Sequence, residues 1–348
     1  IVKSHPMHAG TGELVASAIV NAAQKTGMPD GVFSNLNSSG IEVGVQLVRH
    51  PEVKAVGFTG SITGGRALFD LAASREEPIP VFAEMGSVNP VVMMPEALKE
   101  RPGELAKTYA ASITLGTGQF CTNPGLILGI KGETLDHFVS QLSQEILEID
   151  PGCMLHPNIV SAYQANSALA QGQDGVAVSA HYDGDVMVNY ARQTVTTVSG
   201  EIFLNNPRLH QEVFGPYSLV VQCDHVDQLV EIIGQLEGQL TGTLIAEQGE
   251  AAQFPELIAA MQNRVGRLIY NGVPTGVEVC PAMLHGGPYP ASTDSRFTAV
   301  GVHSIKRWVR PFSYQSWPDE LLPDELKNAN PLGISRLVNN QWTDRPIN

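Results

Sequence analysis

The sequence predicts an α/β fold in which parallel strands are covered by helices. Short apolar runs alternate with helical stretches four times before residue 84, and the connections are short, which favours a parallel sheet with helices on its faces. The 348-residue chain is long enough for two domains. Its 43% hydrophobic and 16% charged residues are typical of a folded soluble protein with an ample core.

The first 83 residues give the clearest part of this pattern. Leu14, Ala18 and Ala22 stand at helical spacing ahead of Gly27, which is a typical helix exit. The expected elements are a helix at 11–26, a strand at 32–36, a helix at 41–49, a strand at 53–59, a helix at 63–74 and a strand at 79–83. This order predicts a Rossmann-like half.

The rest of the chain predicts a second α/β unit and an irregular tail. Its expected elements are a helix at 104–115, a strand at 126–130, a helix at 136–149, strands at 175–180 and 185–189, a loop at 211–216, a strand at 219–222, helices at 226–236 and 255–262, and a strand at 268–271. Residues 291–348 show little periodicity, and from Pro311 onward we expect a tail that wraps another surface.

Composition excludes several classes of function. The net charge of -14, without any Lys or Arg cluster, disfavours nucleic acid or an anionic membrane as a partner. No apolar run reaches the roughly 18 residues of a membrane span, and we expect no signal peptide. The sequence opens on Ile1 without a methionine, so we expect an N-terminal part to be missing.

The cysteines and histidines predict neither a metal site nor disulfides. The four cysteines lack C-x-x-C spacing, which fits a reducing cytoplasm. His5 and His8 are three residues apart, but Pro6 lies between them and no carboxylate is near, so no metal is expected.

The joint at residues 57–65 follows a predicted strand and opens a helix. Gly60 lets a ligand approach the backbone, and free amides at a helix N-terminus favour a phosphate, so this joint could hold a pyrophosphate. It lacks the G-x-G-x-x-G fingerprint, so a plain turn with Ser61 as N-cap is the alternative.

The glycine-rich stretch at 116–125 contains a single cysteine, Cys121. A thiolate is a strong nucleophile, and backbone donors nearby lower its pKa, so Cys121 is a candidate nucleophile. The alternative is a small buried hydrophobic residue.

Five separated pieces occur in a fixed order: Val2-Lys3-Ser4-His5-Pro6, Gly57-Phe58-Thr59-Gly60-Ser61, Ala83-Glu84-Met85-Gly86-Ser87-Val88-Asn89-Pro90, Gly118-Gln119-Phe120-Cys121 and Glu212-Val213-Phe214-Gly215-Pro216. Together they resemble the NAD(P)-dependent aldehyde dehydrogenase superfamily, from Lys3 to about Trp308. The segments at 118–125 and at 285–292, His-Gly-Gly-Pro-Tyr-Pro-Ala-Ser, resemble its α-ketoglutaric semialdehyde (2,5-dioxovalerate) dehydrogenase branch. Met85, Ser87 and Val88 depart from the commoner Glu-Leu-Gly-Gly-Lys motif, a departure tolerated in that branch.

The resemblance implies a role for each matching residue. It makes Cys121 the nucleophile, Glu84 the general base, Lys3 the partner of the adenosine ribose, Gly60 and Ser61 the pyrophosphate contacts, and Glu212 the partner of the nicotinamide ribose with Phe214 packing nearby. It also implies three parts: residues 1–85 as the C-terminal part of the dinucleotide-binding domain, 86–283 as the catalytic thiol domain, and 284–348 as a return segment and tail. An oxyanion-hole asparagine would precede Lys3, and the absence of such a donor typically lowers the rate by about 10² to 10³.

The implied activity is oxidation of an aldehyde, α-ketoglutaric semialdehyde to 2-oxoglutarate, through a cysteine thiohemiacetal and a thioester that water cleaves. The alternatives are a non-catalytic α/β fragment that binds cofactor or partners, and a CoA-acylating or phosphorylating dehydrogenase. The cofactor is NAD(P), and the segment 34–42 contains no Arg or Lys for a 2′-phosphate, which favours NAD or dual use. The expected partners are a small aldehyde and a second copy in a homo-oligomer, a dimer or tetramer. Arg296 is left outside the site.

Overall fold

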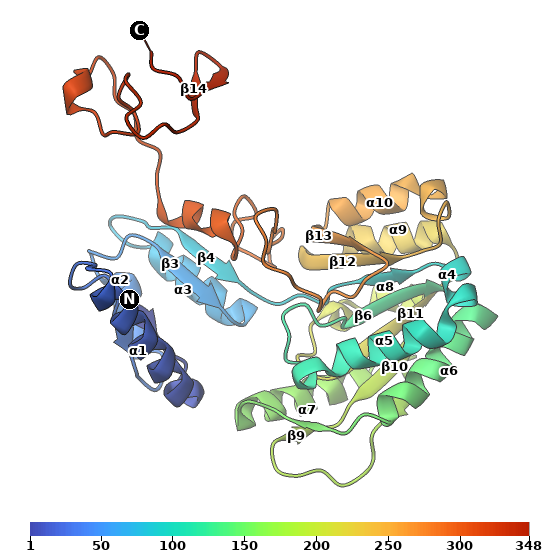
Figure 1. The fold of residues 1–348 in the computed structure, drawn as a ribbon. Coiled ribbons are helices and arrows are strands. Elements are labelled where there is room, and N and C mark those ends of the chain that lie inside the picture. Colours follow the sequence, from blue (N-terminus) through green and yellow to red (C-terminus); the bar gives the residue numbers. More distant parts are fainter. Residues whose placement is uncertain (348) are drawn as a thin grey trace. The chain divides into compact units, whose positions relative to one another are not determined.

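The computed structural model describes residues 1–347 and divides into two compact units, Ile1–Arg307 and the chain from Trp308 onward (Figure 1). The helices are α1 (Ala9–Lys25), α2 (Glu42–Arg49), α3 (Ile62–Ala73), α4 (Pro95–Glu100), α5 (Pro102–Thr114), α6 (Glu133–Leu147), α7 (Pro157–Gln171), α8 (Gly200–Asn205), α9 (Val226–Gln235) and α10 (Pro255–Gln262). Short 3₁₀ helices include η2 (Leu115–Gly118), η5 (Val302–Trp308) and η6 (Asp319–Leu321).

The strands are β1 (Val2–Lys3), β2 (Asn35–Leu36), β3 (Val56–Thr59), β4 (Val81–Glu84), β5 (Val91–Met93), β6 (Leu126–Ile130), β7 (Gly152–Cys153), β8 (Ala177–His181), β9 (Tyr190–Ala191), β10 (Thr194–Ser199), β11 (Tyr217–Cys223), β12 (Gln239–Ile245), β13 (Val265–Tyr270), β14 (Arg336–Val338) and β15 (Gln341–Thr343). Seven of them form the main sheet, in the order β13-β12-β5-β6-β11-β10-β8. All neighbours in it are parallel except β8, which runs antiparallel to β10. The predicted α/β class is confirmed.

Successive residues of the central strands point to opposite faces of this sheet. Ile127 belongs to the core that includes α5 and α6, whereas Leu126 and Leu128 belong to the core that includes α7, α8, α9 and α10. Figure 1 shows α5 and α6 running together along one face, with α9 and α10 next to each other on the other side. Both faces are therefore buried, so functional side chains of this part must come from the loops at the ends of the strands.

The first 85 residues form smaller sheets than the sequence suggests. Strand β1 pairs with β2, and β3 pairs with β4, both in parallel. The two pairs are separate two-stranded sheets and do not form one continuous sheet. Around β3 and β4, Val48, Ala72 and Val81 contribute to a small core.

The predicted strand at 185–189 is wrong. These residues form a loop and turn before β9, and Asn189 adopts a left-handed conformation at φ 69°, which ends extended structure. Three strands of the main sheet, β5, β10 and β12, are additions to the predicted set.

The second unit contains η6 and the hairpin formed by β14 and β15. Asn330 fixes its turns, because its side-chain amide donates hydrogen bonds to the carbonyl oxygens of Ile334 and Asp344 at 2.9 and 2.7 Å. Over residues 1–347, no helix is both long enough and apolar enough to cross a membrane.

Candidate active site

Cys121 lies in the loop between η2 and β6, just before β6 begins and therefore at the amino-terminal side of the parallel strands of the main sheet. The approach to it is left-handed at Gly116, Thr117 and Gly118, with φ of 56°, 60° and 65°. A side chain on Gly118 would overlap the carbonyl group of Gly215. The predicted glycine-rich approach therefore lets the Cys121 loop pack directly on the loop at 211–216.

Glu84 ends β4 and is held on both sides by backbone contacts. The Gly60 N–H donates to the Glu84 carbonyl oxygen at 3.0 Å, and the Met85 N–H donates to the Ala291 carbonyl oxygen at 2.8 Å. An isolated antiparallel bridge also joins Glu84 to Ser292. The Glu84 side chain is 8% exposed, and its Oε2 atom has no hydrogen-bond partner among residues 1–347. A buried carboxylate oxygen is thus available to a ligand.

Cys121 and Glu84 line one cavity of about 370 Å³. Its other lining residues are Gly57, Phe58, Thr59, Met85, His285, Ala299, Val300 and Arg307. Residues that are far apart in sequence therefore meet around a space large enough for a small organic molecule.

Burial changes the protonation of both groups. It raises the pKa of Glu84 to about 7, against the opposing effect of the Arg307 charge. Burial also raises the pKa of the Cys121 thiol, and the negative charges of Glu84 and Glu212 add to this rise. The backbone N–H groups of Cys121 and Thr122 act in the opposite direction and lower the pKa. Near neutral pH the thiol is protonated, and Glu84 is divided between its acid and base forms, so Glu84 can accept a proton in this pH range.

His285 is a contact of Cys121 that the sequence analysis did not assign to the site. Its Nε2 atom lies 3.8 Å from the Cys121 sulfur. The backbone around it is fixed by Thr298, whose hydroxyl accepts the His285 N–H at 2.9 Å. Burial and the Arg267 charge lower the pKa of His285, so the imidazole is neutral at neutral pH. The signal was available, because His285 opens the segment 285–292 that carries part of the resemblance.

Arg307 is the second unassigned residue, and it supplies a cation to the cavity. It lies in η5 and donates a hydrogen bond to the Ala299 carbonyl oxygen at 2.8 Å. No spacing in the sequence marks it, because η5 is short and irregular. Arg296, which the sequence analysis left outside the site, is exposed and paired with Asp294.

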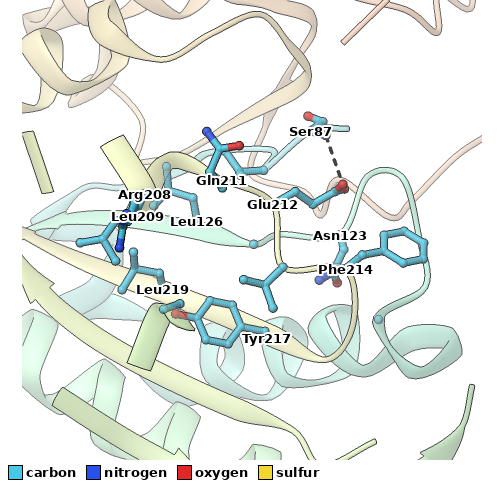
Figure 2. A pocket seen from close by; sticks show the side chains of 15 residues that line it. Ser87, Asn123, Leu126, Arg208, Leu209, Gln211, Glu212, Phe214, Tyr217 and Leu219 are labelled. Carbon is cyan, nitrogen blue, oxygen red and sulfur yellow. Dashed lines mark hydrogen bonds between the residues drawn. The ribbon is translucent and has the colours of Figure 1, made fainter. Parts of the chain in front are cut away.

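Glu212 and Phe214 line a neighbouring small cavity of about 20 Å³, room for about one water molecule (Figure 2). The figure shows the Glu212 carboxylate directed toward Ser87, whose N–H donates to Glu212 Oε1 at 3.4 Å. A Cβ on Gly86 would lie 2.9 Å from Glu212 Oε2. Burial raises the pKa of Glu212 to about 7, opposed by the Ser87 N–H. The predicted loop at 211–216 is confirmed, and it places Glu212 against the segment that follows Glu84.

Gly60 and Ser61 continue the segment 57–59 that lines the larger cavity. The Gly60 N–H is occupied by the Glu84 carbonyl, and a Cβ on Gly60 would lie 2.6 Å from the Phe58 ring. The Ser61 hydroxyl accepts the Gly64 N–H at 3.2 Å and caps α3. The N–H groups of α3 that precede Gly64 are therefore the donors left for an anion.

Lys3 lies on β1 and is half-buried, outside the lining of both cavities. Its role stays a prediction. Among residues 1–347, no group of three or more His, Cys, Asp or Glu side chains is arranged to hold a metal ion.

Comparison with known proteins was made on sequence and on structure. Residues 7–301 match the model of the aldehyde dehydrogenase family. The chain is 45% identical over 337 residues to alpha-ketoglutaric semialdehyde dehydrogenase 2 of Azospirillum brasilense, covering 97% of the chain and 64% of that protein. It is 44% identical over 344 residues to alpha-ketoglutaric semialdehyde dehydrogenase of Acinetobacter baylyi, covering 99% of the chain and 65% of that protein.

The fold is also similar to solved structures. One is a putative methylmalonate-semialdehyde dehydrogenase from Sinorhizobium meliloti, complexed with NAD, with a TM-score of 0.72 and 18% identity. The match covers 87% of this chain and 62% of that one. At this identity the likeness concerns the fold alone.

Proposed function

The chain belongs to the aldehyde dehydrogenase family, and from this premise we propose that the protein oxidises α-ketoglutaric semialdehyde to 2-oxoglutarate with NAD(P). One observation carries the reaction type: Cys121 and the Glu84 carboxyl group line the same cavity, and Glu84 Oε2 has no partner among residues 1–347. The two relatives that bear this substrate in their names support the choice of aldehyde.

The first step that we assign to the chain is addition of Cys121 to the aldehyde. The protonated thiol first gives its proton to a base, for which the Glu84 carboxylate is available near pH 7. The sulfur then forms a bond to the carbonyl carbon, and the electron pair of the C=O π bond moves to oxygen. Backbone N–H groups near the sulfur stabilise the resulting negative charge.

The residues present fit a bound NAD(P). The start of α3, with two first-turn N–H groups unused by the cap, follows directly on the cavity wall at 57–59, where it offers donors for a pyrophosphate. Lys3 and Glu212 would hold the two riboses, with Phe214 beside the latter. When bound, NAD(P)⁺ supplies the acceptor for the hydride that leaves the former aldehyde carbon.

Glu84 carries the last step, hydrolysis of the thioester at Cys121. After the proton taken from the thiol has passed to solvent, the Glu84 carboxylate takes a proton from water, the water oxygen bonds to the acyl carbon, and the sulfur leaves as thiolate, which releases the carboxylic acid. A positioned base contributes about 10²- to 10⁴-fold to such a step. Because Oε2 is buried and unpaired within residues 1–347, it can bind that water directly. Transfer of the acyl group to CoA or phosphate is the competing outcome.

The test follows reduced nicotinamide and product together. Cys121→Ser should lower the rate of reduced-nicotinamide formation by about 10³-fold or more. Glu84→Gln should keep a pre-steady-state burst and slow the steady state, because hydrolysis follows hydride release. Steady turnover by Cys121→Ser at the wild-type rate would reject the assignment, and a product that appears only with CoA or phosphate would replace hydrolysis with acyl transfer.

The cofactor preference and the assembly are also proposals. The segment 34–42 lacks Arg and Lys, which supports NAD or dual use over strict NADP. We place the protein in the cytoplasm as a homo-oligomer, a dimer or tetramer. All four cysteines, Cys121, Cys153, Cys223 and Cys280, are free in this structure, which supports a reducing compartment.

A further inference from the structure

Asn89 lies five residues after Glu84 and is fully buried. Its Nδ2 atom donates to the carbonyl oxygens of Cys121 and Asn123, both at 2.9 Å, and lies 3.2 Å from that of Ser87. Its Oδ1 atom accepts from the hydroxyls of Ser87 and Thr241, both at 2.9 Å. Because carbonyl oxygens only accept, the three carbonyls fix which end of the amide faces the cysteine loop.

The bond to the Cys121 carbonyl has a consequence for the next residue. The carbonyl of Cys121 and the N–H of Thr122 belong to one planar trans peptide and point in opposite directions. With its carbonyl turned to Asn89, this peptide directs the Thr122 N–H away from Asn89. The backbone N–H of Thr122 lowers the pKa of the Cys121 thiol, as expected of a donor that faces the sulfur.

The amide is held in place by a second buried layer. Gln239 Oε1 accepts from the Val88 N–H at 2.7 Å and lies 2.9 Å from the Ser87 hydroxyl oxygen, so the turn that carries Asn89 is tied to β12. Asn89 itself has φ 48°, a left-handed conformation that Asn and Gly tolerate best.

We propose that Asn89 is a positioning residue, whose side-chain amide sets the plane of the Cys121–Thr122 peptide and so makes the Thr122 N–H a donor to the reacting sulfur. The role in catalysis rests on the proposed function, but the effect on the thiol does not. A thiolate that accepts an extra N–H is easier to form than one that lacks it, so removal of the amide should make Cys121 less acidic.

The experiment measures the rate of iodoacetamide alkylation at each cysteine against pH, by mass spectrometry of the full chain. Asn89→Gly removes the amide and tolerates the positive φ, so the alkylation midpoint of Cys121 should rise by about one pH unit. Asn89→Ser retains one hydroxyl donor and should give a smaller rise. The exposed Cys153 and Cys280 serve as internal references and should not change.

Asn330 provides a matched control. It too is buried, has φ 50°, and donates its side-chain amide to two backbone carbonyls, but it lies in the second compact unit. Asn330→Gly should lose a comparable part of its local stability and leave the Cys121 midpoint unchanged. An equal shift in Asn330→Gly would mean a general structural effect and would overturn the proposal.

The outcomes separate this proposal from the proposed function. An unshifted Cys121 midpoint in folded Asn89→Gly, or in Asn89→Ser if the glycine variant does not fold, rejects the positioning role whatever the protein oxidises. If the midpoint shifts, the role stands even when the wild type forms no reduced nicotinamide from the aldehyde. If the wild type does form reduced nicotinamide from the aldehyde, the burst of reduced nicotinamide in Asn89→Gly should be slowed about tenfold, with little change in the affinity for NAD⁺.

Discussion

The two sides of the candidate site are built differently. On the cysteine side, residues 86–125 lie against a seven-stranded sheet with both faces covered, and a buried network around Asn89 holds the loop. On the side where the cofactor is proposed to bind, here called the nucleotide side, residues 1–85 form two small strand pairs, and α1 has a single buried residue, Ala16. Substitutions on the cysteine side should therefore disturb packing and geometry, whereas those on the nucleotide side should change local helix stability and ligand affinity.

The largest effect is expected where the two loops of the cysteine side touch. Gly118→Ala would place a methyl carbon in overlap with the carbonyl carbon of Gly215 and the nitrogen of Pro216, so two segments of backbone would have to move apart. We expect a loss of about 4 kcal/mol or more in the free energy of unfolding, from overpacking together with strain at φ 65°. Chemical denaturation measures it.

Gly116→Ala is the control for that substitution. Gly116 has a similar φ of 56°, but a Cβ there meets nothing within 4 Å. The loss should be the left-handed strain alone, about 1 kcal/mol. Equal losses in the two variants would show that the loop contact is not what requires a glycine at position 118.

Glu84→Gln should stabilise the protein, and increasingly so as the pH rises. The folded state holds the Glu84 proton to a pKa of about 7, whereas an unfolded chain releases it near 4.5. Between these values the unfolded state binds fewer protons, so wild-type stability falls as the pH increases, whereas glutamine does not titrate. Above pH 7 the variant should be more stable by about 3 kcal/mol.

Denaturation at pH 4 and pH 8 checks this prediction. At pH 4 the carboxyl is protonated in both states, and the difference between the proteins should lose its titration component. A difference that does not change between the two pH values would mean that the Glu84 pKa is close to its ordinary value. The same shift predicts that thioester hydrolysis in the wild type rises with pH through about 7 and then levels off.

The sequence grouped two residues that line one cavity but missed three strands of the main sheet. The order of the motifs placed Cys121 and Glu84, and the structure brings them to one cavity. The sequence could not identify Arg307 as a residue of this cavity, because no periodic pattern marks η5. Nor could it assign a role to Asn89, because its partners are backbone carbonyls from another segment, and carbonyls are common to every residue type.

One of the missed strands, β12, lacks the sequence pattern that marks a strand. All seven residues of β12 are buried, and the strand contains Gln239, Thr241, Gly242 and Thr243. A strand covered on both faces shows no alternation of polar and apolar residues, and is instead recognised by a continuous apolar run. In β12 the polar residues and the glycine interrupt that run, so neither pattern is present. By contrast, β6 is aliphatic apart from Gly129, β11 contains the aliphatic run Leu219-Val220-Val221, and both strands were predicted.

A smaller effect is expected at the start of α3 on the nucleotide side. Ser61→Ala removes the hydroxyl that caps Gly64 and should lower the free energy of unfolding by about 1 kcal/mol. Ser61→Asp keeps a cap and adds a negative charge where the pyrophosphate is proposed to bind. It should therefore retain stability and weaken the binding of NAD⁺, as measured by calorimetric titration. Unchanged NAD⁺ affinity in Ser61→Asp would place the pyrophosphate elsewhere.

The smallest effect has the opposite sign and tests how open the nucleotide side is. Gly44 lies inside α2, and a Cβ there meets nothing within 4 Å. Gly44→Ala should raise the free energy of unfolding by about 0.5 to 1 kcal/mol, because alanine loses less backbone entropy in a helix. Gly12 in α1 is the control, since a Cβ there would lie 2.8 Å from the Ser4 hydroxyl, which bonds Asn35. Gly12→Ala should therefore give no such rise in the free energy of unfolding. If Gly44→Ala instead destabilised the protein, position 44 of α2 would have to be in contact with other atoms, and the open space around it would be wrong. The nucleotide side would then be packed more like the cysteine side.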